Sequence, residues 1–198
     1  MESATDAADE TDALRDRARV RLNSRVAITV ALLATFLGVC KVKDDNIVQA
    51  MQQAQADRLD HWNFYQARNI RQEVAAATAT QLKLAAAAAP LAQQDSYRVA
   101  IASYEAVVAD QAKKKEELRL QAEQDQKTYD ALNYRDDQFD LSDTLIALAI
   151  SLLALTSLTH KRWLYWIAMV PTALGVLMGM AGLFGWPIHP DAIARLLS

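Results

Sequence analysis

A small number of residues have types and spacing that could do chemistry. Asp57 and His61 stand four positions apart, which would place two metal-ligating side chains on one face of a helix. A third ligand of matching type is not evident, and isolated pairs of this kind are common. The sequence also contains no glycine-rich phosphate loop, nucleophile elbow or paired metal motif. We therefore expect no catalytic residue, no cofactor and no metal, and we predict that the protein is not an enzyme.

Two reactive side chains lie beside apolar segments. Cys40 ends the sequence LGVC, which is close to a bacterial lipoprotein box, but such boxes place a small residue before the cysteine and Val39 is not small. We therefore expect a buried or lipid-facing thiol. Asp143 begins a later apolar segment, where we expect a favourable interaction with a helix N-terminus. A role for Asp143 in a proton or ion pathway would require a deeper position and a partner.

The composition favours a helical protein. Hydrophobic residues make up 52 % of the 198 residues but aromatic residues only 7 %, and much of the excess is alanine. Five glycines and four prolines are few, which argues against a β-rich fold. The net charge of −3 gives no sign of a nucleic-acid partner. With one cysteine, no internal disulfide can form.

Three apolar segments are predicted to cross a membrane as helices: residues 26–42, 143–159 and 163–186. The uncharged part of the first segment, residues 26–40, would form roughly 22 Å of helix, less than a hydrocarbon core of about 30 Å. Flanking basic side chains can reach the interface and complete the span. A cleaved signal peptide fits poorly, because a long polar stretch precedes the segment and no small-x-small cleavage site follows it.

The third apolar segment carries two further signals. Aromatic residues near both of its ends match the interfacial belts of membrane proteins: Trp163, Tyr165, Trp166 and Trp186. Within it, Gly175, Gly179 and Gly182 are small enough to let another helix approach closely. That neighbouring helix belongs either to the other apolar segments of the same chain or to a second copy.

The distribution of basic residues predicts the orientation in the membrane. Residues 1–25 are first acidic and then rich in arginine, and residues 160–162 read HKR. Because basic residues favour the cytoplasmic side, both segments are predicted to be cytoplasmic. The long segment 43–142 and the short tail 187–198 would then lie outside the cytoplasm, in the periplasm of a bacterium with two membranes.

Residues 43–142 are almost all compatible with helix and are predicted to form a long antiparallel hairpin with a turn near residues 90–95. Pro90 cannot continue a helix into which it falls, and Asp95 or Ser96 can cap the next helix. Each arm of about 45 residues would be roughly 65–70 Å long. Helices of that length need to pack on each other or on other copies to be stable.

A coiled-coil-like seam is predicted between the two arms. In the second arm, residues at alternating steps of four and three form a heptad ladder: Tyr97, Ile101, Tyr104, Val108, Gln111, Lys115, Leu118, Ala122, Asp125, Tyr129 and Leu132. In the first arm the expected seam residues are less regular: Leu59, Trp62, Tyr65, Ile70, Val74 and Ala77. The ladder is polar in its middle, so the hairpin alone would be marginal, and we expect further helices from other protomers.

The segment HWNFYQARNIRQ, residues 61–72, is the densest signal in the hairpin. Trp62 and Tyr65 are three positions apart and share a helix face. We expect these two rings to fill the seam against Leu118 and Ala122 of the second arm.

The basic residues of the same segment allow two interpretations. In the first, Arg68 and Arg71 pair with acidic residues of the second arm, such as Glu117 or Glu116. In the second, the segment is a protein-contact surface, because Trp, Tyr and Arg anchor many interfaces. The residues of that surface would be Trp62, Phe64, Tyr65, Arg68 and Arg71.

The segment WNFYQARNIR, residues 62–71, resembles a W-x-F-Y-Q-A-[KR]-x-[IL]-R-like segment of an uncharacterised family of bacterial inner-membrane proteins, described as a domain of unknown function. The lead RLNSRV, residues 21–26, is similar to the basic sequence before the family's first transmembrane helix. The helical stretch and the final membrane hairpin complete the resemblance, which covers nearly the whole chain. It implies a fold and a bacterial inner-membrane location, and it implies no activity.

These observations predict an all-α integral membrane protein with three transmembrane helices and a long helical hairpin between the first and the second. We expect a non-enzymatic structural or interaction protein that forms oligomers or serves as an accessory subunit. Its partners would be the lipid bilayer and either copies of itself or other membrane proteins, with no small-molecule substrate. The alternative is a component of a transport or channel assembly, with Asp143 as the residue to test.

Overall fold

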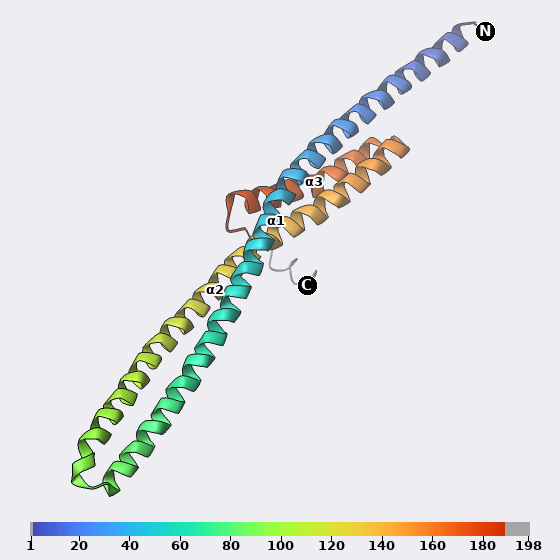
Figure 1. Ribbon diagram of the computed structural model, residues 1–198. Helices are drawn as coiled ribbons and strands as arrows, with labels where there is room; N and C mark the ends of the chain where they lie inside the picture. Colours follow the sequence, from blue (N-terminus) through green and yellow to red (C-terminus); the bar gives the residue numbers. More distant parts are fainter. Residues whose placement is uncertain (1, 189–198) are drawn as a thin grey trace. The chain divides into compact units, whose positions relative to one another are not determined.

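The computed structural model describes the backbone of residues 2–188 and the side chains of residues 14–188. Within this part the chain forms three α-helices and no strand: α1, Glu2–Ala88; α2, Leu91–Thr159; and α3, Arg162–Phe184 (Figure 1). The prediction of an all-α protein is confirmed. The chain divides into two compact units. We call Met1–Gln49 with Leu132–Ser198 the bundle unit, and Ala50–Ala131 the hairpin unit.

The turn between α1 and α2 is set by Pro90. α1 ends at Ala88 and α2 begins at Leu91, so the break occupies two residues. Pro90 cannot donate a hydrogen bond to α1. Its carbonyl instead accepts one from Gln93 N, at 2.9 Å, which starts the next helix. The expected capping role of Asp95 or Ser96 is therefore wrong, because α2 is already formed where they stand.

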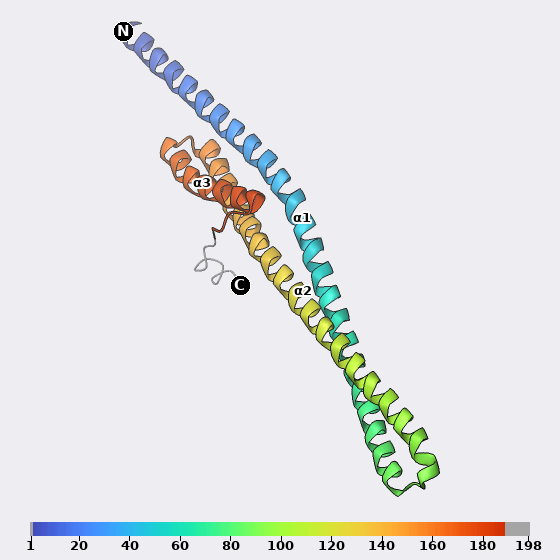
Figure 2. The same cartoon turned by 90° about the vertical axis from the view of Figure 1, so that its left-hand side faces the viewer.

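The hairpin unit consists of the last part of α1 and the first part of α2, lying side by side (Figures 1 and 2). Near the turn, Lys83 Nζ lies 2.6 Å from Glu105 Oε1. Farther from the turn, His61 Nδ1 lies 2.7 Å from Asp125 Oδ2. The residue numbers run in opposite directions in these contacts, so the two segments are antiparallel.

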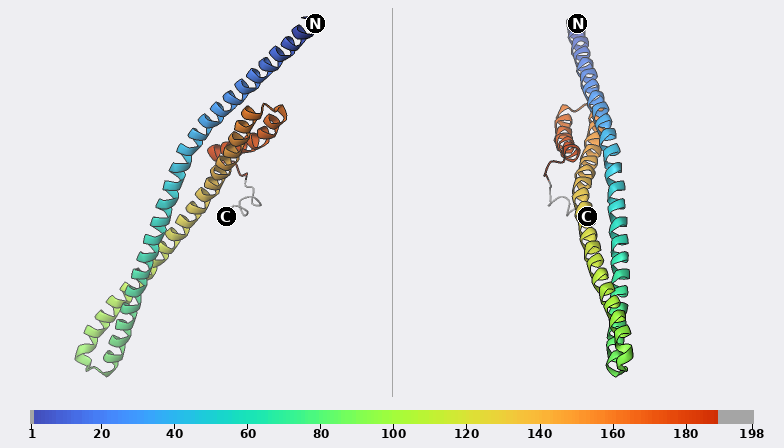
Figure 3. Two further views of the ribbon diagram at one scale, coloured as in Figure 1. Left: turned by 90° about the vertical axis from the view of Figure 1, so that its right-hand side faces the viewer. Right: turned by 60° about the vertical axis from the view of Figure 1, so that its left-hand side comes forward.

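The bundle unit packs α3 against the remaining parts of α1 and α2, and Figure 3 shows α3 turning back beside the end of α2. Its buried core draws on all three helices: Val26, Leu33, Ile146, Ala149, Leu153 and Ala168. The link between α2 and α3 is two residues long, and His160 adopts a positive φ of 54° there. The His160 N–H donates to the Thr156 carbonyl at 2.9 Å, which closes the last turn of α2.

Each of the three helices contains a stretch long and apolar enough, by length and composition, to cross a membrane. The outer surface of the bundle unit fits such a setting, because large apolar side chains from every helix are exposed on it: Ile28, Leu32, Val39, Leu148, Leu155, Trp166 and Val170. α3 ends at Phe184, two residues before the predicted boundary at 186, because Gly185 adopts the left-handed conformation that ends many helices. The fold is compatible with a multi-pass membrane protein.

Candidate functional site

Polar pairs join the two helices of the hairpin unit. Five pairs cross the seam: Arg58 with Gln126, His61 with Asp125, Arg68 with Gln111, Asn69 with Lys115, and Lys83 with Glu105. The apolar residues buried with them include several alanines: Ala54, Ala75, Ala79 and Ala122. Small side chains let the helices approach closely but bury little apolar area. Matched polar contacts, rather than large apolar groups, therefore specify this seam.

The expected place in the seam is wrong for Leu59, Ile70 and Val74, whereas Trp62 and Tyr65 are partly buried. Leu59, Ile70 and Val74 are 55 %, 64 % and 61 % exposed and point away from the second helix. The reason lies in the polar middle of the second arm. If apolar side chains had faced Gln111 and Lys115, those polar groups would have been covered without partners, which is costly. The helix instead turns its own polar side chains inward.

This arrangement leaves an apolar surface on the outside of α1, which we call the outer stripe: Leu59, Ile70, Val74 and Leu84. At 3.6 residues per turn, these positions lie within about a quarter of the helix circumference and extend over roughly 37 Å. The positions between them on the same face are uncharged: Asn63, Ala67, Ala77 and Gln81. Sequence reasoning missed this surface because it assigned Leu59, Ile70 and Val74 to the seam.

The structure divides the five residues of the expected contact surface between two places. Trp62 and Tyr65 are partly buried, their ring centroids are 5.2 Å apart, and Lys115 Nζ lies 5.7 Å from the Tyr65 ring centroid. Phe64 is 60 % exposed, and Arg71 is exposed as well. Arg71 makes no hydrogen bond or ion pair within the part of the chain that the structure describes.

The predicted ion pairs of the basic residues are wrong. Arg68 NH1 donates to Gln111 Oε1 at 3.1 Å instead of meeting Glu116 or Glu117. Glu116 is engaged within its own helix, where its Oε1 lies 2.5 Å from Arg119 NH2. A pair three positions apart on one helix needs no adjustment of a second helix, so it forms more readily.

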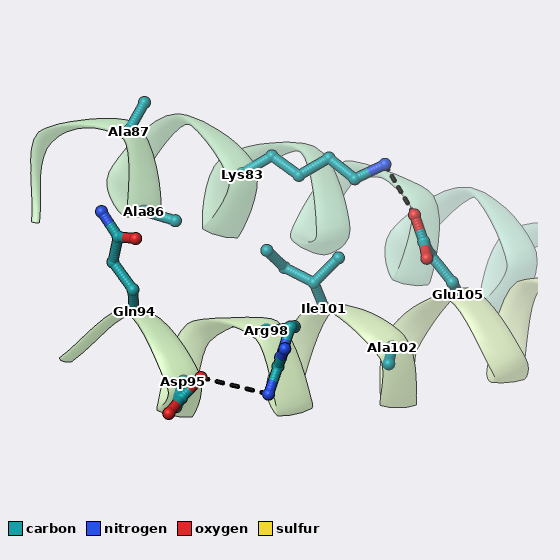
Figure 4. A pocket seen from close by; sticks show the side chains of 9 residues that line it. All are labelled: Lys83, Ala86, Ala87, Gln94, Asp95, Arg98, Ile101, Ala102 and Glu105. Atoms are coloured by element: carbon teal, nitrogen blue, oxygen red, sulfur yellow. Dashed lines mark ion pairs between the residues drawn. The ribbon is translucent and has the colours of Figure 1, made fainter. Parts of the chain in front are cut away.

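A hollow of 570 Å³ lies at the turn of the hairpin unit and opens to solvent (Figure 4). Its charged side chains already have partners: Lys83 with Glu105 at 2.6 Å, and Arg98 with Asp95 at 3.1 Å. No charged group lining the hollow is left for a ligand. This end of the hairpin unit is therefore not a candidate binding site.

The glycines of α3 pack within the same chain. A Cβ atom added to Gly179 would lie 2.7 Å from both the Phe36 ring and Ser142 Oγ. One added to Gly175 would lie 2.8 Å from Ile146, and one added to Gly182 would lie 2.8 Å from the Phe139 ring. All three glycines are buried. In this structure the small residues serve the approach of α3 to α1 and α2, not to a second copy.

Three polar side chains of α2 hold the end of α3. Arg135 NH2 donates to the Gly182 carbonyl at 2.8 Å, and Ser142 Oγ donates to the Gly175 carbonyl at 2.8 Å. Gln138, which is fully buried, donates through Nε2 to the Trp186 and Ile188 carbonyls at 2.9 and 2.7 Å. The Gly182 carbonyl lies in the last turn of α3, where carbonyls have no partner within the helix, so Arg135 satisfies it. The Gly175 carbonyl lies inside α3, and those of Trp186 and Ile188 belong to the segment that follows it.

Carboxyl groups from α1 and α2 gather elsewhere in the bundle unit. Asp44 is buried, and its Oδ2 accepts a hydrogen bond from Lys41 Nζ at 2.8 Å. Burial, together with contact to Asp44, raises the pKa of Asp136 to about 6. Burial and the charge of Asp44 also raise the pKa of Asp140. This cluster could not be predicted from sequence patterns, because its members come from distant parts of the chain.

The remaining residues singled out for chemistry have ordinary surroundings. Asp57 accepts a hydrogen bond from Gln53 at 2.7 Å, while His61 contacts Asp125, so the two side chains engage different partners. Asp143 lies in the interior of α2, so its expected position at a helix N-terminus is wrong. Cys40 is buried. No group of three or more metal-ligating side chains is present among the described residues.

The fold defines an all-α protein whose three helices are long and apolar enough to span a membrane. A family model described as "Domain of unknown function (DUF4337)" matches residues 22–185. The chain therefore belongs to this family, which confirms the expected membership in a family described as a domain of unknown function. Neither the curated proteins nor the solved structures yield a match.

Proposed function

We propose that this protein is a non-enzymatic, multi-pass membrane protein that binds another protein through its hairpin unit. The observation that supports this most directly is the outer stripe. Leu59, Ile70, Val74 and Leu84 are large apolar residues held in water-facing positions of a regular helix. Contiguous exposed apolar surface is typical of protein-contact sites in soluble regions.

The membrane location rests on the bundle unit. Its apolar stretches and apolar outer surface suit lipid, and the sequence motif indicates a bacterial inner membrane. The arginines of residues 15–25 and the basic residues 160–162 favour a cytoplasmic N-terminus and a cytoplasmic α2–α3 link. The hairpin unit then lies on the extracytoplasmic side.

A second copy of the chain is the first candidate for the partner. Two identical faces can meet only if they do not repel, and the uncharged outer stripe meets this condition. The seam inside one hairpin unit buries mostly alanine, so packing two stripes together would add the large apolar contacts that the single hairpin lacks. An accessory role, with another membrane protein on the stripe, uses the same surface.

The experiment compares the mass of the detergent-solubilised protein by light scattering for the parent chain and for Ile70→Glu and Val74→Glu. We expect an oligomer for the parent and a monomer for both variants, because a charge within the stripe would be buried without a partner. Val99→Glu is the matched control, since Val99 is 68 % exposed on the other helix and outside the stripe.

Two results would count against the proposal. A parent chain that is monomeric, with a hairpin unit that melts cooperatively, would remove self-association. If crosslinking from the stripe in membranes then captured no other protein either, the stripe would have no partner. Protease accessibility in sealed vesicles tests the orientation separately.

A further inference from the structure

One oxygen of Asp44 has no hydrogen-bond donor. The residue is only 5 % exposed, and its Oδ2 is occupied by Lys41 Nζ at 2.8 Å. Its Oδ1 is buried and receives no hydrogen bond from any residue that the structure describes. A buried carboxylate oxygen without a donor is unfavourable, because it has lost water and gained nothing in return.

A second carboxyl group supplies the missing donor if it carries a proton. Asp136 of α2 lies within hydrogen-bonding reach of Asp44 of α1. Two ionised carboxylates at this range repel each other, whereas a carboxyl and a carboxylate form a strong O–H···O hydrogen bond. We infer that Asp44 and Asp136 form a proton-binding site in which protonated Asp136 donates a hydrogen bond to Asp44 and so connects α1 to α2.

The charges around the pair favour this protonation. From α1, Lys41 and Asp45 lie nearby, 3.7 Å apart. From α2, the charges of Asp137 and Asp140 raise the pKa of Asp136, and the charge of Asp143 raises the pKa of Asp140. From α3, the charged residue within the described part is Arg162, at its first turn. One lysine therefore faces several carboxylates, and an additional proton reduces their repulsion.

The direction of the pH effect follows from the shifted group. Burial and Asp44 raise the pKa of Asp136 from an ordinary 3.8 to about 6. Between these two values the folded protein binds a proton that the unfolded chain does not, so folding is favoured as the pH falls. As the pH rises through about 6, the proton of Asp136 is lost and the contact between α1 and α2 is weakened.

The test is thermal unfolding of the full chain in detergent from pH 5 to 8. We expect the Tm of the parent to fall as the pH rises from 5 and to level off above about 6. In Asp136→Asn the amide always donates and only Asp140 is left to titrate, so the Tm should fall less through this range and should exceed that of the parent at pH 7.5. Asp45→Asn is the matched control and should keep the parent profile, since Asp45 is exposed.

A local measurement separates the pair from general effects of pH. Cys40, the single cysteine, is buried and lines a small cavity together with Asp44 and Asp143. At a fixed pH of 7.5, thiol labelling should be several-fold slower in Asp136→Asn than in the parent. A parent Tm that does not fall from pH 5 to about 6, or an equal fall in Asp136→Asn, would overturn the inference.

A different observation carries a second inference, which rests on the proposed membrane insertion. A cavity of 300 Å³ in the bundle unit is lined by basic side chains from α1 and from the start of α3. Its lining includes Arg15, Arg19, His160 and Arg162. Arg19 NH1 also lies 3.7 Å from Asp16 Oδ1, in a long ion pair whose two side chains are exposed and which an anion can replace. No acidic residue occurs in the first turn of α3, and Lys161 makes no capping hydrogen bond there. The cavity is therefore suited to an anion.

The position of this cavity indicates which anion. Arg162 directly precedes the apolar stretch of α3. Arg19 lies seven residues, or about 10 Å of helix, before the first apolar segment, whose uncharged part of roughly 22 Å is about 8 Å shorter than the hydrocarbon core. With half of that difference at each end, Arg19 lies about 6 Å beyond the core. The headgroup layer of a bilayer extends roughly 5–8 Å beyond each side of the hydrocarbon core. We propose that the cavity binds the phosphate of an anionic phospholipid headgroup, with Arg19 and Arg162 as its principal donors.

The test uses the full chain in nanodiscs of phosphatidylcholine, with and without phosphatidylglycerol. We expect phosphatidylglycerol to raise the Tm of the parent and to have little effect on the double variant Arg19→Gln/Arg162→Gln. Arg17→Gln is the matched control, because Arg17 belongs to the same basic run but does not line the cavity. Inorganic phosphate added to phosphatidylcholine nanodiscs should not reproduce the shift.

The outcomes are distinguishable. Failure of the chain to enter nanodiscs would refute the proposed membrane function itself. Insertion with an equal response in the double variant and in Arg17→Gln would show diffuse attraction to acidic lipid and would overturn the headgroup site. A full response to inorganic phosphate would assign the cavity to a free anion instead.

Discussion

His61 Nδ1 lies 2.7 Å from Asp125 Oδ2, which joins two residues that are 64 positions apart in the chain. Both side chains are partly buried, at 29 % and 22 % exposure. The contact lies toward the end of the hairpin unit that is far from the turn, where the sequence offers polar residues on both helices. The contact shows that polar side chains in the seam have specific partners on the opposite helix.

A double-mutant cycle measures what this contact contributes. We expect His61→Gln and Asp125→Asn each to destabilise the hairpin unit by about 0.5–1.5 kcal/mol, the range for one intramolecular hydrogen bond. The coupling between them should be about 0.5–1 kcal/mol. Hydrogen exchange of backbone amides near both residues is the measurement, because it reports local opening. The exposed pair Gln53 and Asp57 within α1 is the comparison, and a coupling as small as theirs would contradict the assignment.

The glycine contacts of α3 predict a steric effect. Gly179→Ala should destabilise the bundle unit by about 1–3 kcal/mol, because the new methyl group would overlap Phe36 and Ser142 in a packed region. Gly38→Ala is the control, since nothing lies within 4 Å of its added Cβ atom. Thermal unfolding in detergent checks both. Equal, small changes in the two variants would show that α3 is not packed as closely as the structure has it.

The hydrogen bonds of Gln138 predict a role in holding the end of α3. Gln138→Leu removes the two hydrogen bonds that Gln138 Nε2 donates to the Trp186 and Ile188 carbonyls. We expect this loss to lower the free energy of unfolding by about 1–3 kcal/mol. Faster hydrogen exchange in residues 180–188 is the expected signature. The exposed Gln124→Leu on the same helix should leave that exchange unchanged. If both variants behave alike, the end of α3 is held by apolar packing.

The acidic cluster predicts that Lys41 affects its titration and that Lys43 does not. Lys41 lowers the pKa of Asp140, so removing its charge in Lys41→Gln should raise that pKa further above the ordinary value. The pH at which the bundle unit loses stability should move upward accordingly, because the carboxyls hold protons to higher pH. Lys43→Gln should leave the midpoint in place. A titration of Tm against pH distinguishes the two, and a downward move in Lys41→Gln would be inconsistent with the cluster.

The fold class was predictable from local physics. A helix-rich composition, a single proline break and apolar segments of sufficient length predict long helices with a turn near Pro90, and α1 and α2 meet there. The exact start of α2 was not predictable from capping signals. Asp95 and Ser96 are good caps in isolation, but Pro90 begins a helix earlier.

Three residues of the first arm were wrongly assigned to the seam because hydrophobic periodicity was the only guide. Leu59, Ile70 and Val74 look like core residues when α1 is considered alone. Which face is buried depends on the partner helix, and that helix offers Gln111 and Lys115, which require polar partners. Single-helix patterns carry no information about such matching.

The carboxyl cluster was beyond sequence reasoning for a similar reason. Asp44 and Asp136 look like two acids among many in a chain with 24 acidic residues. Only the packing of α1 on α2 buries the first and brings the second to it. Asp143, which the sequence did single out, lies on the exposed side of α2.

The polar pairs of the hairpin unit also determine how its helices can move. A slide by one helical turn, about 5.4 Å, would separate His61 from Asp125 and Asn69 from Lys115 at the same time. The alanines beside them would accept a new alignment, but the polar groups would not. The hairpin therefore has one favoured register, because sliding one helix along the other would break these polar pairs.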